Sequence, residues 1–425
     1  MKDCGAVGKS VLKNDVLDRV TGRALYAADI ELDGMLYGKV LRSRTAHALV
    51  KNIDTSKAEN LPGVVKILTY RDIPGENGVG IILKDEPVLV KDKIRRFGDA
   101  IALVAAETEQ AAEEALKLID VEIEELPVVA DVIAAMDENS PAVHGKTNIL
   151  ATKTLIKGDP DKAFQECDII IENTYKTNPV AHMFIEPQAA VAKYEDNVVT
   201  FWCSTQNPHF DRGEVARVLG LPKNRVRGIQ ADTGGGFGGK LDIAAQCHAA
   251  LLAYHTGRPV KIVHTYEETM FTSSKRHMYI MKYKTGASKD GKLIAMEAEL
   301  ILDTGAYASY GPGVLTRGMV HSTGPYEIPN VRVKGYLVYT NNPMAGAMRG
   351  FGVPQVAVAH ESQMDILAER LNIDPFEIRL KNAFRKGSQT ATKQVLEHSV
   401  GIVQTIEAAR EKAQELFGIE RGSRP

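Results

Sequence analysis

One segment of the sequence combines a dense run of glycines with a lysine, a pattern that could hold an anion. The segment 233–242, TGGGFGGKLD, contains five glycines. Gly234, Gly236 and Gly239 match the dinucleotide pattern G-x-G-x-x-G, and Lys240 extends the run toward the phosphate-loop pattern G-x-x-x-x-G-K-[ST]. In both patterns glycine backbone N–H groups approach phosphate oxygens without a Cβ atom in the way.

Neither nucleotide hypothesis fits the surrounding residues. Leu241 stands where a phosphate loop needs the Ser or Thr that binds magnesium. A dinucleotide site needs a continuous apolar strand before the glycines and an acidic residue about twenty positions after them. Here RVRGIQA precedes the glycines with alternating charged and apolar residues, and GRPVKIV follows without an acid. Because each glycine costs stability through unfolded-state entropy, we expect the run to let some other anionic or oxo-bearing ligand approach the backbone.

Composition and charge narrow the class of protein. The chain has 425 residues, 44% hydrophobic and 25% charged, which predicts two or three globular domains. A net charge of −2 without a long basic run argues against nucleic acid or an anionic membrane as the main partner. The sequence shows no secretion signal and no membrane-spanning apolar stretch, so we expect a cytoplasmic protein. Its four cysteines are far apart, which argues against an iron–sulfur cluster or structural zinc held by this chain alone.

Hydrophobic periodicity predicts an α+β fold with mixed sheets rather than alternating βαβ units. Thr108 is placed to cap a helix through TEQAAEEALKLI, and the pair Asp290-Gly291 predicts a hairpin turn. Further helices are expected over 241–257, about 356–371 and 402–417, and a strand pair around a polar turn over QAAVAKYEDNVVTFWCST. We expect two domains, 1–135 and 136–425, the second including a connecting strap.

Three further segments, taken with the glycine run, resemble one enzyme family. They are DRVTGRALYAADIELDGMLYGKVLRS near the start, CSTQNPHFDRGEVARVLGL around Gln206, and NNPMAGAMRGFGVPQVAVAHESQMD around Arg349. In this order, over nearly the whole chain, they are similar to the molybdopterin-binding subunit of the molybdenum hydroxylases, the xanthine oxidase/aldehyde oxidase family. The resemblance implies an N-terminal α/β-hammerhead domain followed by a mixed-sheet molybdopterin-binding domain.

The resemblance also implies roles for particular residues. Gln206 would approach an oxo or hydroxo ligand of molybdenum and act as the catalytic side chain. Arg317 and Phe351 would face the substrate. The backbone segments that would line the metal and the pterin comprise Gly236, Phe237, Gly238, Met348, Arg349 and Gly350. No side chain would bind the metal, because the dithiolene of the pterin holds it.

The family's chemistry is hydroxylation with water as the oxygen source. The cofactor implied is molybdopterin with molybdenum, which we expect as the cytosine dinucleotide with a terminal sulfido or selenido ligand. A glutamate serves as the base, and electrons leave through iron–sulfur clusters to FAD, which would lie on partner subunits. Nothing in this chain matches the glutamate's motif. We therefore expect a second molybdopterin subunit to supply the base, unless the chain is a fragment of a longer one.

Two positions bear on the substrate. Xanthine-oxidising members of the animal type carry a glutamate directly after the Lys of GGFGGK, where this chain has Leu241, while Arg317 is retained in VLTRGMVHSTGPYEIPN. An arginine without that glutamate suits an aromatic carboxylate, because a guanidinium grips a carboxylate through two parallel bonds. We expect nicotinate, converted to 6-hydroxynicotinate. A purine or xanthine hydroxylase subunit and a cofactor-carrying scaffold subunit without activity of its own remain the alternatives.

Overall fold

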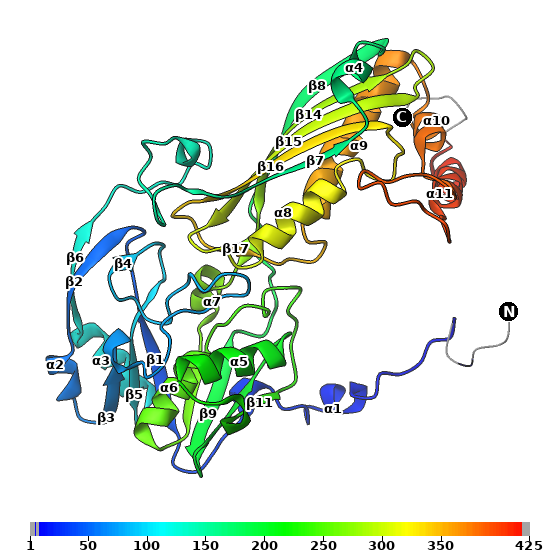
Figure 1. Cartoon of the computed structure of the whole chain (residues 1–425). Coiled ribbons are helices and arrows are strands. Elements are labelled where there is room, and N and C mark those ends of the chain that lie inside the picture. Colours follow the sequence, from blue (N-terminus) through cyan, green and yellow to red (C-terminus); the bar gives the residue numbers. More distant parts are fainter. Residues whose placement is uncertain (1–4, 6–7, 419–425) are drawn as a thin grey trace.

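The computed structural model describes residue 5 and residues 8–418, and these form two lobes around two large sheets (Figure 1). The lower lobe holds a seven-stranded sheet in the order β11-β10-β9-β12-β1-β5-β3, and the upper lobe a five-stranded sheet in the order β7-β16-β15-β14-β8. The strands of the first sheet are β1 Leu36–Arg42, β3 Val64–Leu68, β5 Ala100–Ala106, β9 Ala189–Glu195, β10 Val198–Cys203, β11 Val226–Gln230 and β12 Val260–Val263. Those of the second are β7 Ile149–Lys157, β8 Ile169–Thr177, β14 Met278–Ala287, β15 Leu293–Gly305 and β16 Asn330–Tyr339. Mixed sheets with helices packed on them confirm the α+β prediction.

The seven-stranded sheet contains strands from both ends of the sequence. β1 pairs in parallel with β12, with Leu36 opposite Val260, although more than 200 residues separate them. Every residue of β5 is buried, because α6 (Gln246–Thr256) and α5 (Pro208–Val218) lie over one face and α3 (Glu109–Leu118) over the other. A three-stranded sheet, β4 (Lys93–Ile94), β2 (Ala48–Asp54) and β6 (Asp120–Glu125), and the short α2 (Ser56–Glu59) complete the N-terminal part. The division at residue 135 stays a prediction.

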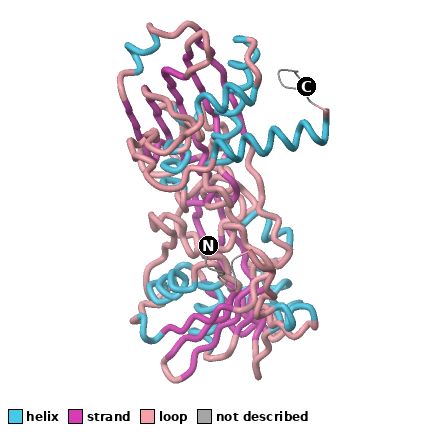
Figure 2. Tube along the Cα trace, turned by 90° about the vertical axis from the view of Figure 1, so that its right-hand side faces the viewer, coloured by secondary structure: helices cyan, strands magenta, loops and turns pink. Residues whose placement is uncertain are grey.

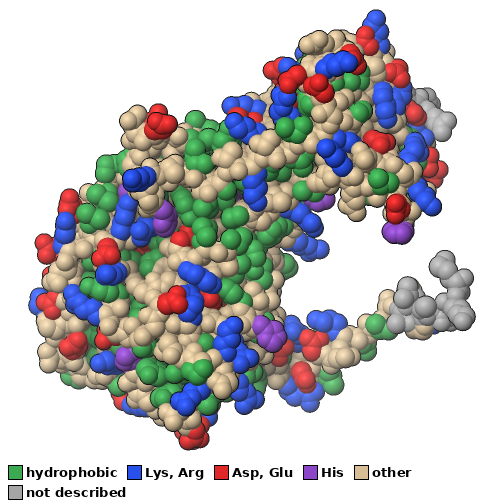
Figure 3. Space-filling model, in the orientation of Figure 1, with side chains coloured by type: hydrophobic (Ala, Val, Ile, Leu, Met, Phe, Trp, Pro, Cys, Tyr) green, Lys and Arg blue, Asp and Glu red, His purple; other side chains and the backbone are tan. Residues whose placement is uncertain are grey.

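Two helices of the upper lobe pack on one face of its sheet. The core joins Tyr279 and Tyr283 of β14 to Val314 and Leu315 of α8 (Gly311–Val320) and to Val356 of α9 (Val353–Leu371). The expected hairpin is present between β14 and β15, and Gly291 at its turn has φ +82°. The connecting strap packs against the same sheet, because Val129, Val132 and Ala135 form a cluster with Ile301 and Val338. The space-filling view shows a hollow between the two lobes, with hydrophobic side chains gathered on its wall (Figure 3).

Several local predictions are confirmed, and one helix start is wrong. The Thr108 hydroxyl accepts a hydrogen bond from the Ala111 N–H at the start of α3. The polar turn between β9 and β10 uses Asp196 and Asn197, both with positive φ. Helix α6 begins at Gln246 rather than near residue 241. Residues 241–245 form bends instead, because Asp242 turns inward to accept from the Ser309 hydroxyl at 2.7 Å.

The remaining short elements surround the junction of the lobes or lie at the ends. α4 (Pro160–Phe164) packs on the upper sheet, while α7 (Tyr266–Thr272) and the pair β13 (Lys275–Arg276) and β17 (Ala345–Gly346) lie between the lobes (Figure 1). α1 (Val16–Val20) lies on an N-terminal arm, and α10 (Pro375–Asn382) packs on α9. The last helix, α11 (Ile402–Phe417), matches its predicted bounds, buries no residue and projects sideways (Figure 2). In the described part of the chain, each helix is too short or too polar to span a bilayer.

Candidate functional site

Two loops from distant parts of the chain touch at the junction of the lobes. One is the glycine loop, residues 234–240, and the other is the loop 347–352 that follows β17. An ideal Cβ on Gly238, whose φ is +109°, would lie 2.4 Å from the Ala347 carbonyl oxygen. The Arg349 N–H donates to the Phe237 carbonyl at 2.9 Å. The structure thus brings the two segments of the predicted cofactor site together, with a glycine required at their contact.

Gln206 follows β10 and is bound to the same glycine loop. Its Oε1 accepts from the Gly238 N–H at 2.9 Å and lies 3.4 Å from the Lys240 nitrogen, while its own N–H donates to the Lys240 carbonyl at 2.9 Å. The side chain is nevertheless exposed. Since the loop occupies the amide oxygen, the Nε2 group remains as a donor. This Nε2 group is free to donate a hydrogen bond to an oxygen that lies over the glycine loop.

The glycines of this loop are required by contacts within the chain itself, which the sequence did not indicate. A Cβ on Gly236 would lie 2.6 Å from Gln206 Oε1, and one on Gly234 would lie 2.6 Å from the Glu186 Cβ. A Cβ on Gly239 would meet the Phe184 ring at 2.7 Å. The expectation that these positions are glycine only to admit a ligand is therefore incomplete. The loop is a tightly packed crossing of three chain segments.

Lys240 forms a buried ion pair that the sequence did not indicate. Its Nζ donates to Glu186 Oε2 at 2.6 Å and to the Ser204 hydroxyl at 2.9 Å, and its side chain is fully buried. The same Glu186 oxygen accepts from the Gly234 N–H at 2.6 Å. Burial lowers the pKa of Lys240, and the bond to Glu186 opposes that shift. Lys240 thus holds the loop from beneath, which gives a second reason to reject a phosphate loop.

Several backbone N–H groups of the two loops have no protein acceptor. Those of Gly235, Gly236 and Phe237, and those of Met348 and Gly350, donate to no atom of the described residues. Unpaired N–H donors on two touching glycine-rich loops can form a cradle for anionic or oxo groups. The cradle fits the oxo groups and the phosphate of a molybdopterin. The roles of these residues in cofactor binding stay a prediction.

Both phenylalanines of the site have strained backbones. Phe237 and Phe351 adopt φ of +53° and +51°, a region that bulky residues rarely occupy. Phe237 is 48% exposed beside the glycine loop. The Phe351 ring is half-buried and packs edge-on against Tyr310 with 5.8 Å between ring centres. Such strain persists only where surrounding contacts hold it, so the fold itself fixes the position of both rings.

Arg317 lies on α8, one helical turn beyond the point where Phe351 contacts this helix. An ideal Cβ on Gly313 of α8 would lie 3.2 Å from the Phe351 ring, and Arg317 follows Gly313 by four residues on the same face. The guanidinium is exposed and makes no hydrogen bond or ion pair with the described residues. A cation without a counter-ion, one helical turn from the residue that meets an aromatic ring, is suited to an aromatic anion.

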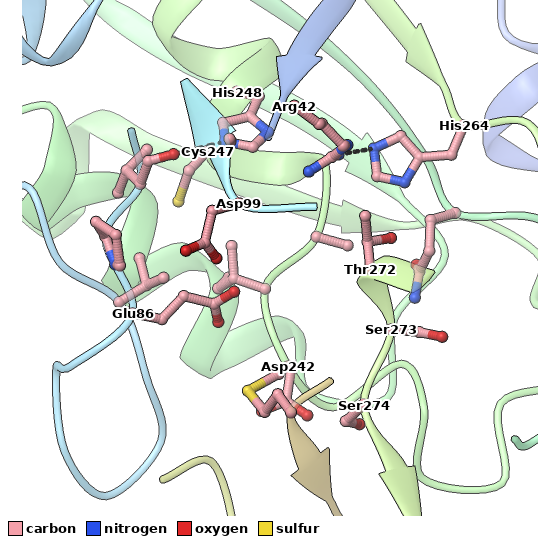
Figure 4. A pocket seen from close by; sticks show the side chains of 18 of the residues that line it. Arg42, Glu86, Asp99, Asp242, Cys247, His248, His264, Thr272, Ser273 and Ser274 are labelled. Carbon is pink, nitrogen blue, oxygen red and sulfur yellow. Dashed lines mark hydrogen bonds between the residues drawn. The ribbon is translucent and has the colours of Figure 1, made fainter. Parts of the chain in front are cut away.

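A polar cavity of about 40 Å³ lies beneath the glycine loop, between the N-terminal part and the rest (Figure 4). Arg96 pairs there with Glu86 at 2.8 Å and with Asp99 at 3.3 Å, and burial raises the pKa of Glu86 to about 7. Asp242, which follows the glycine loop, lines the same space. Its volume suits a few waters and excludes a ring-sized substrate. The cavity therefore joins the two parts of the chain rather than holding substrate.

Comparison with known proteins identifies the family to which the chain belongs. Residues 21–127 match the family described as "Aldehyde oxidase and xanthine dehydrogenase, a/b hammerhead domain", and residues 143–383 match "Molybdopterin cofactor-binding domain". The aldehyde oxidoreductase structure from Desulfovibrio gigas is similar with a TM-score of 0.91 and 33% identity, over 95% of this chain and 46% of that one. Quinoline 2-oxidoreductase from Pseudomonas putida 86 gives a TM-score of 0.88 and 28% identity, over 96% and 54%. The chain belongs to the molybdenum hydroxylases, as a large molybdopterin subunit.

Two relatives give a more specific functional indication. The nicotinate dehydrogenase large molybdopterin subunit of Eubacterium barkeri is 55% identical over 99% of both chains. A Bacillus subtilis protein named as part of a probable xanthine dehydrogenase is 43% identical, over 88% of this chain and 50% of its own length. The chain thus spans nearly all of the first relative and about half of the second.

Proposed function

We propose that this chain is the large molybdopterin subunit of an enzyme that hydroxylates nicotinate to 6-hydroxynicotinate with oxygen from water. The observation that carries the proposal is the unpaired Arg317 guanidinium, one helical turn from the Phe351 ring at the contact of the two loops. The similarity to the Eubacterium barkeri protein supports it. A second molybdopterin subunit would supply the glutamate base, and iron–sulfur and FAD subunits would carry electrons away in the cytoplasm.

The chain's own residues would hold and orient the reactants. The free N–H groups at 235–237 and of Met348 and Gly350 would hold the molybdopterin, which we propose carries a cytosine dinucleotide and a terminal sulfido or selenido ligand. When bound, this cofactor supplies oxygen transfer and accepts two electrons. The Nε2 group of Gln206 would donate a hydrogen bond to an oxygen above the loop. Arg317 would fix the carboxylate while Phe351 packs on the ring.

A purine substrate is the second candidate, and one observation favours it. The Bacillus subtilis relative is named as part of a probable xanthine dehydrogenase. Against it, Leu241 offers no acceptor at the position after Lys240, and its N–H donates back to the Gly238 carbonyl at 3.3 Å. The Leu241 side chain therefore gives a purine ring no polar partner, whereas Arg317 gives a carboxylate one.

Arg317→Met in the assembled, cofactor-loaded complex tests the substrate. The change keeps an unbranched side chain, shorter than arginine, and removes its charge and donors. Truncating one half of a buried charge pair costs about 2–5 kcal/mol, and because Arg317 is exposed in this chain we expect the lower end, about 30-fold in kcat/KM for nicotinate. Nicotinamide, which lacks the charge, should lose much less.

Arg370→Met is the matched control, since Arg370 is also an exposed helical arginine without a partner among the described residues. It should leave both substrates unaffected. Equal losses for nicotinate and nicotinamide in Arg317→Met would mean that Arg317 grips no carboxylate, and the nicotinate assignment would then be wrong. Turnover of xanthine faster than that of nicotinate by the wild type would favour the second candidate.

A further inference from the structure

A strained turn directly before α8 lies at the edge of the candidate site. Ser309 is 2% exposed and has φ +40°, a left-handed conformation that residues with a side chain rarely adopt. Tyr310 follows it, and α8 begins at Gly311. A strained residue keeps such a conformation only where neighbouring contacts hold it. The positions of Tyr310 and of the start of α8 therefore depend on what holds Ser309.

The side chain of Asp242 holds Ser309. The Ser309 hydroxyl donates to Asp242 Oδ1 at 2.7 Å, and both residues are buried. Burial raises the pKa of Asp242, and the bond from Ser309 opposes that shift. A hydroxyl forms a stronger bond with an ionised carboxylate than with a neutral acceptor. Because Asp242 comes shortly after the glycine loop, this bond ties the end of that loop to the strained turn.

The second loop of the site packs against the same hydroxyl. An ideal Cβ on Gly346, the residue directly before the 347–352 loop, would lie 2.6 Å from Ser309 Oγ. A side chain at this position would displace the hydroxyl. Ser309 thus lies between the segment after the glycine loop and the segment before the 347–352 loop, and its hydroxyl has little freedom to choose another acceptor.

Tyr310 connects this turn with Phe351. The two rings pack edge-on with 5.8 Å between their centres. A Cβ on Gly313, in the first turn of α8, would lie 3.2 Å from the same Phe351 ring. Burial raises the pKa of Tyr310, and the charge of Asp242 raises it further, so the carboxylate acts on the phenol as well. A displaced turn would therefore move the surface on which Phe351 packs.

We propose that Asp242 is a positioning residue for the substrate ring. Through its bond with Ser309 it holds the turn that places Tyr310 and the start of α8 against Phe351. Asp242 acts through these residues and needs no contact of its own with the substrate. The proposal rests on the function proposed above in one respect, the place of Phe351 beside the substrate ring.

This role differs from that of Arg317 in the substrates that it affects. The ring is common to nicotinate and nicotinamide, whereas only nicotinate carries the charge that Arg317 would bind. Loss of Asp242 should therefore weaken both substrates alike. An aromatic contact contributes about two- to tenfold in affinity, so we expect KM to rise by about that factor for each.

Fluorine NMR of the full-length chain tests the positioning without any substrate. The chain contains 14 tyrosines, so the Tyr310 signal of the chain labelled with 3-fluorotyrosine is identified by its loss in Tyr310→Phe. Asp242→Ala and Ser309→Ala should each shift this signal, and the double variant should shift it no further. Asp242→Asn keeps an oxygen that accepts from Ser309 and should shift the signal much less.

Ser309→Gly separates the loss of the bond from the strain. Glycine adopts φ +40° without a side-chain clash, so the turn should keep its place without the hydroxyl. We expect the Tyr310 signal of Ser309→Gly to lie nearer to that of the wild type than the signal of Ser309→Ala does. Asp242→Ala should shift it no further in the Ser309→Gly background. Thermal unfolding of each variant checks that the chain is folded.

Glu327→Ala is the matched control. Glu327 Oε2 accepts from the Ser388 hydroxyl at 2.8 Å, a carboxylate–serine bond of similar length that lies before β16. Its loss should leave the Tyr310 signal and the KM of both substrates unchanged. An equal shift of the Tyr310 signal in Glu327→Ala and Asp242→Ala would mean a general loosening of the chain and would overturn the proposal.

The assembled, cofactor-loaded complex gives KM for the two substrates. Asp242→Ala should raise both values by the same factor at unchanged molybdenum content, and Asp242→Asn should avoid most of the loss. An unchanged Tyr310 signal in Asp242→Ala, or a shifted signal with unchanged KM values, would overturn the proposal. A rise for nicotinate alone would assign the effect to Arg317. If the complex turned over neither substrate, the proposed function would be wrong, while the fluorine measurement would still decide whether Asp242 holds the rings.

Discussion

Replacing Gly238 by alanine should separate the two loops of the site. The new Cβ would lie 2.4 Å from the Ala347 carbonyl oxygen and 3.0 Å from the Met348 Cα, so one loop must move by about 1 Å to reach ordinary contact. That movement strains the Arg349–Phe237 bond and the His182–Ala347 bond, each contributing about 1 kcal/mol. The positive φ of Gly238 adds about 1–2 kcal/mol for a residue with a side chain. We expect a loss of about 3–4 kcal/mol in the local free energy of unfolding.

Gly257→Ala separates the two contributions. Gly257 has φ +67° at the end of α6, and a Cβ there meets no atom within 4 Å, so only the backbone cost of about 1–2 kcal/mol applies. Denaturant titration and limited proteolysis of the 347–352 loop compare the variants, and molybdenum content reports retention of the cofactor. If Gly238→Ala were no more destabilised than Gly257→Ala, with the same molybdenum content, the packed contact of the loops would not support the site.

Three further side chains give predictions. Gln206→Ala should retain cofactor and lower turnover by on the order of 10²-fold, measured in the assembled complex; unchanged turnover would remove Gln206 from the reacting centre. Lys240→Met should cost about 3–5 kcal/mol by leaving Glu186 buried without its cation, and adding Glu186→Gln should recover most of this in denaturant titrations. Asp211 is fully buried, and burial raises its pKa from 3.8 to about 7, so the folded chain holds a proton that the unfolded chain loses. Stability should therefore fall as pH rises between these values, and Asp211→Asn should flatten that slope in thermal scans; an unchanged slope would contradict the assignment.

Structural features set by residues close together in the sequence could be predicted, whereas features set by contacts between distant residues could not. Helix α11 and the start of α3 were predictable because periodicity and the Thr108 cap are local features. The early start expected for α6 was wrong because Asp242 bonds to Ser309, which lies 67 residues away. Charged and apolar residues alternate along β11 although it pairs in parallel with β10, because α5 packs on one face of this edge strand and residues such as Arg227 remain exposed.

The candidate site was predictable in its residues but not in its physical basis. Its members were identified by resemblance, since Gln206 and Arg349 carry no individual signal of function. Glu186 escaped notice because its partner Lys240 lies 54 positions later, although HMFIEPQ offered a buried-looking acid between apolar residues. The positive φ values of the two phenylalanines follow from tertiary contacts, which no local pattern contains.

The parallel pairing of β1 with β12 constrains how such a polypeptide can be divided. A break in the strap would leave β1 and β12 as unpaired inner edges, each displaying backbone donors and acceptors beside apolar side chains. Each piece would then expose an edge that favours association, and pairing with the other piece would cover both edges. The region that resembles a hammerhead module is thus unsuited to exchange between enzymes by simple recombination, because its recipient must provide a strand of matching register.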